Sequence, residues 1–252
     1  MKKLYLIILV FLPISGTYAQ TAMVKNNPDY DDHPLHFGYT LGLNTMDFTF
    51  GRNWVKANNS DPNKYLYADV AGKQLGFQVG MIVDFRLGEY FNLRCLPSFN
   101  FGQRNISFFT TPYPTPKLAL AHPDSTKLNL SLTMESSMLD FPFLIKYKAK
   151  RINNYRPYLL AGGSVRYDLA AKKKFNDDNQ QYLLLKPLDL YAEMGFGIDY
   201  YLQYFKFSTE IKLSLGLLNV LNPKQDTPDH DQYVKALTKL TSNIVMISFH
   251  FE

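Results

Sequence analysis

An alternation of apolar and polar residues recurs along this chain and constrains its fold more than any other feature. In the segment 75–85, Leu75, Phe77, Val79 and the other odd positions are apolar. The even positions are polar or glycine, except Ile82. Because successive side chains of a strand point to opposite faces, the pattern predicts a β-strand with one face in an apolar medium and the other in a polar one.

The same alternation predicts further strands elsewhere in the chain. The regular ones cover 37–44, 91–101, 188–198, 205–215 and 245–251, and less regular ones cover 130–147 and 157–169. Pro142 lies inside one of the less regular strands. Proline cannot donate a ladder hydrogen bond, so we expect a bulge or a locally broken pairing at this position.

Long and short connections alternate between these strands. The long ones are 51–72, 103–129, 170–187 and 219–242, and the short ones are 86–90, 148–156 and 201–204. Bacterial outer-membrane barrels have short periplasmic turns and long outer loops. The sequence therefore predicts an all-β fold, an eight-stranded antiparallel up-and-down transmembrane β-barrel with four long extracellular loops and both termini in the periplasm. The soluble alternative is a lipocalin-like barrel or a sandwich, whose apolar face would point inward.

The start of the chain has the features of an export signal. Lys2 and Lys3 precede an apolar stretch, and Thr17-Tyr18-Ala19 offers a small-X-small cleavage site. We expect cleavage between Ala19 and Gln20. The predicted organisation is thus a signal peptide over 1–19, a periplasmic segment over 20–35 and an outer-membrane barrel over 36–252.

No segment predicts a transmembrane helix or a disulfide. The apolar stretch near the start is shorter than the roughly 20 residues that a spanning helix needs, and no later stretch is longer. Cys95 is the only cysteine, so it has no partner within the chain. The formal net charge is +5, but the basic residues are scattered among acidic ones. We therefore expect no nucleic acid as a partner.

If the apolar face contacts lipid, the polar face lines a lumen. At eight strands this lumen is about wide enough for side chains to fill, so a channel is not expected. Both signs of charge occur on the polar face, and unpaired buried charges would be costly. We interpret these residues as a structural charge network: Asp84, Arg94, Asp140, Lys146, Arg166, Asp168, Asp189, Glu193, Asp199, Lys206, Glu210 and Lys212.

One pair on the same face has the residue types of a hydrolase. Ser248 and His250 share a face of the last strand, and an acid such as Glu210 could complete a triad. No G-x-S-x-G turn accompanies them. We therefore expect no hydrolase chemistry at this pair and predict no catalytic residues.

Two segments rich in aspartate and histidine raise the question of a metal. Neither has a fixed ligand spacing, and Pro34 and Pro228 place both in irregular chain. Solvated, partner-binding segments are therefore favoured over weak calcium sites, and no metal is predicted. The residues are Asp29, Asp31, Asp32, His33 and His36 in one segment, and Asp226, Asp229, His230 and Asp231 in the other.

The aromatic residues that follow the outer strand ends are expected in the interfacial belt of the membrane rather than in a ligand platform. They are Trp54, Phe108, Phe109 and Tyr113. The loop 110–124 contains Pro112, Pro114, Pro116 and Pro123, so it should be stiff and extended.

Three motifs resemble the PorT/SprT family of the Bacteroidota. They are His36-Phe37-Gly38-Tyr39-Thr40-Leu41-Gly42-Leu43-Asn44, Ser98-Phe99-Asn100-Phe101-Gly102-Gln103-Arg104 and Leu139-Asp140-Phe141-Pro142-Phe143-Leu144-Ile145-Lys146-Tyr147. The resemblance covers nearly the whole mature chain. It implies an outer-membrane component needed for type IX secretion and, in gliding species, for motility. It implies neither enzyme activity nor a cofactor.

The expected function is thus that of a non-enzymatic barrel that acts through its surfaces and not as a pore. The expected partners are outer-membrane lipid, the barrel assembly machinery and other type IX secretion subunits. Phe251 is the expected assembly signal, although the sequence ends Phe251-Glu252 and a terminal aromatic is more common. The alternative function is a general small barrel that binds a ligand or surface polymer through its extracellular loops. An outer-membrane hydrolase is less favoured.

Overall fold

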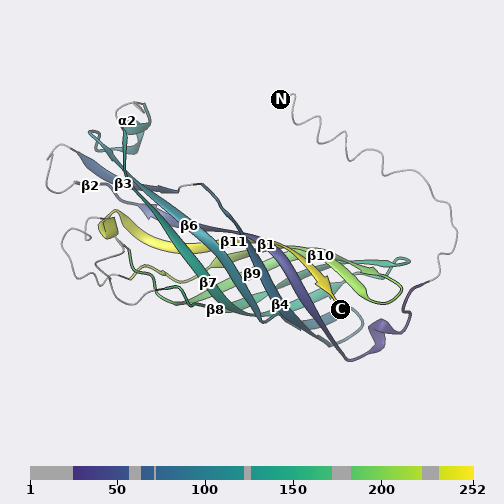
Figure 1. The fold of residues 1–252 in the computed structure, drawn as a ribbon. Coiled ribbons are helices and arrows are strands. Elements are labelled where there is room, and N and C mark those ends of the chain that lie inside the picture. Colours follow the sequence, from purple (N-terminus) through teal and green to yellow (C-terminus); the bar gives the residue numbers. More distant parts are fainter. Residues whose placement is uncertain (1–24, 57–63, 71, 122–125, 172–182, 223–232) are drawn as a thin grey trace, which may run out of the picture.

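The computed structural model describes residues 25–56, 64–70, 72–121, 126–171, 183–222 and 233–252. Its strands form one closed antiparallel ring, drawn in Figure 1, in the order β1-β11-β10-β9-β8-β7-β5-β4, with β4 pairing back to β1. The bounds are β1 (Leu35–Arg52), β4 (Leu75–Arg86), β5 (Phe91–Cys95), β6 (Ser98–Thr111), β7 (Lys127–Lys148), β8 (Tyr155–Asp168), β9 (Leu188–Tyr201), β10 (Lys206–Gly216) and β11 (Leu237–Phe251).

β5 and β6 are two pieces of a single barrel strand. Both pair with β4 on one side and with β7 on the other. Counted as one, they complete the ring of eight that the alternation predicts. The predicted all-β antiparallel barrel is therefore confirmed.

Pro142 affects the neighbouring strand rather than its own. β7 runs through Pro142 without a bulge, and its register with β8 continues at Pro142 opposite Ser164. The interruption lies at Leu96 and Pro97, between β5 and β6. Pro97 and Pro142 both lack an amide donor, so this is where the ladder is broken. The expected bulge is absent, whereas the expected local break in pairing is present opposite β7.

The apolar face of the barrel points outward. Phe37 is 66% exposed, Met81 62% and Leu75 78%, whereas the polar Asp84 and Asn100 are 0% exposed. A soluble barrel or sandwich would bury the first group and expose the second. The predicted soluble alternative is thus wrong, because the exposed apolar side chains form the surface that meets lipid.

The strands on one side of the barrel continue well beyond the apolar surface, and there the phase of the alternation inverts. In β1, Leu41 and Leu43 point outward, but further along Phe48 points inward while Thr49 is exposed. The same inversion occurs in β6, where Phe99 points outward and Ile106 inward. Lipid surrounds the first part of each strand and water the second, so the apolar residues change face.

We name this extension the outer arm and define it as the sheet formed by β7 up to Ser137, β6 from Gly102 onward, β3 (Tyr65–Val70) and β2 (Val55–Lys56). β3 pairs with β6 over Val70 to Tyr65, and β2 pairs with β3. In Figure 1 these strands extend together beyond the ring, with the helix α2 (Pro116–Ala121) at their tip. Parts of the predicted long connections 51–72 and 103–129 are therefore strand.

The helix α2 corrects the expected extended conformation of loop 110–124. Pro116 occupies the first helical position, where the missing amide donor costs nothing, and Lys117 to Ala121 are good helix formers. None of the helices in the described residues is long and apolar enough to span a membrane.

The segment before β1 folds across the opposite end of the barrel. It contains the short 3-10 helix η2 (Tyr30–Asp32). The Asn26 side-chain amide donates to the Tyr201 carbonyl at 3.0 Å, and the Asp31 carboxylate forms an ion pair with Arg156 at 3.1 Å. The part of the predicted segment 20–35 that the structure describes is thus docked on the barrel rather than solvated. Residues 1–24, including the predicted cleavage site, lie outside the described residues.

Candidate functional site: the barrel interior and its two ends

Arg94 is the centre of the ion pairs at the end of the barrel where the short turns lie. This side chain is fully buried, and its guanidinium lies 2.8 Å from Asp84, 3.4 Å from Glu210 and 2.8 Å from Glu252. The Asn92 amide donates to the other Asp84 oxygen at 2.6 Å. Alternation alone places Asp84, Asn92, Arg94 and Glu210 on the inner face of their strands, but only closure of the ring brings them together.

Lys206 and Lys146 neutralise the remaining acids of this layer. The Lys206 ammonium lies 2.5 Å from Glu252, and the Lys146 ammonium lies 2.7 and 2.9 Å from the two oxygens of Asp199. The Ser208 hydroxyl donates to the same Asp199 carboxylate at 2.6 Å. Lys146 also lies 3.8 Å above the ring centre of Tyr158, which adds a cation–π contact.

A second layer of charges occupies the middle of the barrel. Arg166 contacts Asp140 at 3.0 Å and Glu193 at 2.5 Å, and Lys212 contacts the other Glu193 oxygen at 2.9 Å. The hydroxyls of Ser164 and Ser214 donate to Glu193 as well. Both layers thus combine ion pairs with hydrogen bonds, which is the arrangement that buried charges require.

Asp168 and Asp189 lie nearer the outer end. Asp168 forms an ion pair with Arg104 at 2.7 Å. Asp189 accepts hydrogen bonds from the backbone amides of Leu190 and Leu218 at 2.8 and 3.3 Å. All twelve residues of the predicted charge network are buried.

Three partners of the network were missed by sequence reasoning. Arg104 lies beyond the predicted end of its strand, although it keeps the even phase of Asn100. His250, whose imidazole lies 3.2 Å from Glu210, was considered only for catalysis. Glu252 follows the last strand. Glu252 is an even-numbered position, like the inward-facing Ser248 and His250. This alternation could have identified it as a member of the network.

The segment before β1 covers the charged end. The Tyr30 hydroxyl donates to Glu252 at 3.4 Å, and burial raises the pKa of Tyr30, so it remains a neutral donor. The Tyr201 hydroxyl donates to Asp31 at 2.8 Å. The Arg151 guanidinium lies 3.6 Å from the ring centre of Tyr201. This end of the barrel is therefore closed by the chain itself.

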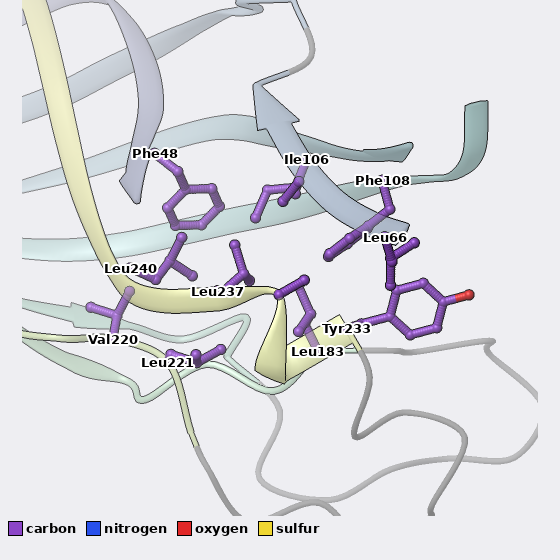
Figure 2. Packing of buried hydrophobic residues seen from close by; sticks show 12 residues of the cluster. Phe48, Leu66, Ile106, Phe108, Leu183, Val220, Leu221, Tyr233, Leu237 and Leu240 are labelled. Atoms are coloured by element: carbon purple, nitrogen blue, oxygen red, sulfur yellow. The ribbon is translucent and has the colours of Figure 1, made fainter. Parts of the chain in front are cut away.

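The outer end contains an apolar cluster that we name the outer plug. Figure 2 shows its side chains pointing toward one another from β1, β3, β6 and β11 and from the outer loops. Ile106, Phe108 and Leu240 are 0% exposed. Together with the ion pairs, the outer plug leaves the barrel filled at both ends. Its members are Phe48, Leu66, Ala68, Ile106, Phe108, Leu183, Val220, Leu221, Tyr233, Ala236, Leu237 and Leu240.

The Ser248, His250 and Glu210 set has no catalytic geometry. The Ser248 hydroxyl donates to the side-chain amide oxygen of Gln78 at 3.3 Å and not to the imidazole. His250 pairs with Glu210, which also accepts from the Tyr158 hydroxyl at 2.8 Å. Nucleophilic catalysis needs the serine and the base within hydrogen-bond reach, and this arrangement directs them to other groups.

The first acidic and histidine segment uses its side chains within the fold. Asp31 contacts Arg156 and Tyr201, and Asp32 forms an ion pair with Arg86 at 3.0 Å. The His36 imidazole stacks on Tyr30. The described residues contain no group of three or more His, Cys, Asp or Glu side chains placed to hold a metal. Asp226, Asp229, His230 and Asp231 lie outside the described residues.

Of the aromatic residues predicted for the membrane belt, Phe108 does not lie there. Phe108 points inward into the outer plug. Trp54 and Phe109 flank Tyr67 in a stacked row on the outer arm, with ring centres 4.3 and 5.7 Å apart. Phe109 lies eight positions beyond Phe101 of the apolar surface, or roughly 26 Å along the strand. The position of Trp54 and Phe109 in the interfacial belt stays a prediction.

Comparisons with known proteins give the following matches. A family model described as "Outer membrane protein beta-barrel domain" matches residues 18–222. The outer membrane protein OprG of Pseudomonas aeruginosa is 11% identical, with a TM-score of 0.45, covering 85% of this chain and 94% of that one. Neisserial surface protein A is 10% identical, with a TM-score of 0.41, covering 86% and 98%. The comparison with curated proteins found no match.

Proposed function

The chain belongs to the outer-membrane β-barrel family that this model describes, and on that premise we propose that it is a non-enzymatic component required for type IX protein secretion. As a member of this family it is an outer-membrane protein. The finer assignment is supported by the resemblance of its strand motifs, among them the segment Leu139 to Tyr147, to the PorT/SprT family. In gliding species the same component would serve motility.

The observation that carries the proposal is the filled interior. Ion pairs around Arg94 occupy one end of the barrel, and the outer plug occupies the other. A polypeptide could pass through this lumen only if both the ion pairs around Arg94 and the outer plug were disrupted. Breaking buried ion pairs is costly. The protein therefore acts through its surfaces, and passage of cargo belongs to its partners.

The proposal includes an orientation and an assembly route. Both termini and the short turns face the periplasm, and the outer arm faces the cell exterior. A signal peptide over 1–19 is removed between Ala19 and Gln20, and Phe251 is recognised by the barrel assembly machinery. Phe251 is an outward-facing aromatic that stacks on Tyr39 at 4.9 Å between ring centres, so it lies on the lipid side, where such machinery could bind it.

A gene deletion tests the secretion role. The deletion strain should fail to release cargo that carries the C-terminal secretion signal, and the wild-type gene supplied in trans should restore release. Cargo with an ordinary export signal serves as the control. Normal release in the deletion strain would reject the proposal. Purification of the intact barrel from its native membrane should recover other secretion subunits, which would also identify the partners.

The outer arm favours a second candidate, a barrel that binds a ligand or surface polymer. On β7 the arm presents polar side chains, with Ser131, Thr133 and Glu135 exposed. Replacement of the residues 53–70 by a short turn would remove β2 and β3. Such a variant that keeps secretion but loses binding to the cell-surface polymer would favour this second function.

A further inference from the structure

One strand of the outer arm has an edge along which no strand of the described residues pairs. β7 pairs with β6 from Lys127 to Asp140, but its pairing with β8 begins only at Met138. Among the described residues, therefore, β7 has a strand on one side only from Lys127 to Ser136. This stretch lies beyond the lipid-facing apolar surface, where an unpaired edge presents its backbone groups to water.

The hydrogen bonds of Ser137 show which residues face the open side. The Leu169 amide donates to the Ser137 carbonyl at 2.8 Å, and the Ser137 amide donates to the Asp168 carboxylate at 3.3 Å. Backbone groups of alternate residues point to the same side of a strand. The amides and carbonyls of Ser131, Thr133 and Glu135 therefore face the open edge, and no described residue bonds to them there.

The strand β11, which also extends past its neighbour, has its edge capped. β11 pairs with β10 only from Asn243 onward. The Val220 amide nevertheless donates to the Leu240 carbonyl at 2.9 Å, and the Asn219 side chain accepts from the Leu240 amide at 3.0 Å. Chain from the preceding loop thus caps that edge. No described residue caps the edge of β7 in this way, and β1 likewise continues past β4 from Met46 to Arg52.

The two faces of this edge differ in chemistry. Leu130, Leu132 and Met134 point inward and pack against the outer plug. Ser131 and Thr133 point outward and are exposed. Natural sheets protect long edges with prolines, inward charges or covering loops. The stretch from Leu128 to Ser136 has no proline, and its one charged residue, Glu135, points outward.

A second copy of this chain does not fit the edge. Antiparallel pairing of two identical edges has its two-fold axis perpendicular to the sheet. The wall of the barrel runs parallel to the barrel axis. A two-fold rotation about an axis perpendicular to the wall would therefore turn one barrel upside down relative to the other. Two barrels inserted in the same membrane in the same direction cannot satisfy it.

We propose that the edge of β7 from Lys127 to Ser136 is a docking site for an extended segment of a partner polypeptide, which joins the outer arm as an additional strand. The partner segment bonds to the backbone of Ser131, Thr133 and Glu135. Its alternate residues are apolar and extend the outer plug beside Leu132, and a basic residue lies opposite Glu135. The inference rests on the open edge alone and does not depend on the secretion role.

The substitution Thr133→Pro tests the open edge without disturbing the rest of the fold. Because the Thr133 amide faces the open side, proline there removes a donor needed by an added strand and leaves the pairing with β6 intact. Thr133→Val is the matched control, since valine keeps the amide and favours strand geometry. The heat-modifiable gel shift of both variants should equal that of the wild type.

The test uses the full mature barrel in lipid nanodiscs and amide hydrogen exchange followed by NMR. In the free barrel the amides of Ser131, Thr133 and Glu135 should exchange quickly, whereas those of Leu132 and Met134 should be protected by β6. The probe is a short peptide of alternating valine and threonine with one lysine. Its control is the same peptide N-methylated at alternate residues, which removes donors from one edge.

The peptide should protect the edge amides in the wild type and in Thr133→Val, and the N-methylated peptide should not. In Thr133→Pro its affinity should fall on the order of tenfold or more. Slow exchange of all five amides in the free barrel would overturn the proposal, because the chain would then cover its own edge. Equal binding to Thr133→Pro, or no protection by the peptide in the wild type, would overturn it as well.

Discussion

The Glu252 carboxylate lies 2.8 Å from the Arg94 guanidinium inside the barrel, although 158 positions separate the two residues in the sequence. Both side chains are fully buried. The contact joins the residue after β11 to β5 across the interior. Since Arg94 also contacts Asp84 and Glu210, one cation balances carboxylates from three parts of the ring.

Arg94→Leu should therefore destabilise the barrel strongly. The substitution leaves three buried carboxylates without their shared cation, and removing one partner of a buried ion pair costs about 3–5 kcal/mol. The measurement is the urea midpoint of the heat-modifiable gel shift in lipid vesicles. Arg86→Leu is the control, because the Asp32 partner of Arg86 is 73% exposed. Loss of this exposed ion pair should cost about 1 kcal/mol or less. Similar losses for the two variants would contradict the interior ion-pair arrangement.

Lys146 and Asp199 should show strong energetic coupling. Lys146→Met and Asp199→Leu each leave one buried charge unpaired and should each cost about 3–5 kcal/mol. The double variant removes both charges, so it should be more stable than the sum of the single losses predicts. A double-mutant cycle of unfolding free energies gives the coupling. Additive losses would mean that the two groups, 2.7 Å apart here, do not interact in the folded barrel.

The outer plug should contribute to stability through packing. Leu240→Ala removes a fully buried side chain from the cluster and should cost about 2–5 kcal/mol. Leu128→Ala, at a residue that is 59% exposed on the outer arm, should change stability by about 0.5 kcal/mol or less. Fluorescence of Trp54, the only tryptophan, follows unfolding at this end of the molecule. Equal effects of the two substitutions would argue against a packed plug.

An arginine substitution on the lipid-facing surface should destabilise the barrel more, the deeper it lies in the bilayer. Leu41 points outward between Val79 and Phe249, so Leu41→Arg should cost about 2–4 kcal/mol in a bilayer. Thr49→Arg lies further along the same strand, on the water-exposed part, and should cost about 1 kcal/mol or less. Guanidinium titrations of the refolded protein in vesicles measure both losses. A larger loss of stability for Thr49→Arg than for Leu41→Arg would contradict a lipid boundary that lies between these two residues.

The strand pattern shows how far sequence reasoning reaches. Period-two alternation is a local property, so it identified each barrel strand and placed Leu41 outward and Asp84 inward without knowledge of the pairing. It also ended the predicted strand near Asn44, because beyond that point the apolar residues change face. The inversion from Leu43 to Phe48 was itself a signal that the strand leaves the lipid and continues in water.

The alternation in the sequence by itself determined that strands separate lipid from a charged interior, because that choice depends only on which side of each strand is apolar. Only the tertiary structure decided that Glu252 is paired with Arg94, that loop residues such as Leu183 join Phe48 in the outer plug, and that the segment before β1 covers the charged end. Those contacts depend on the register with which the ring closes. Register sets which positions of distant strands lie at the same height, and no local pattern contains that information.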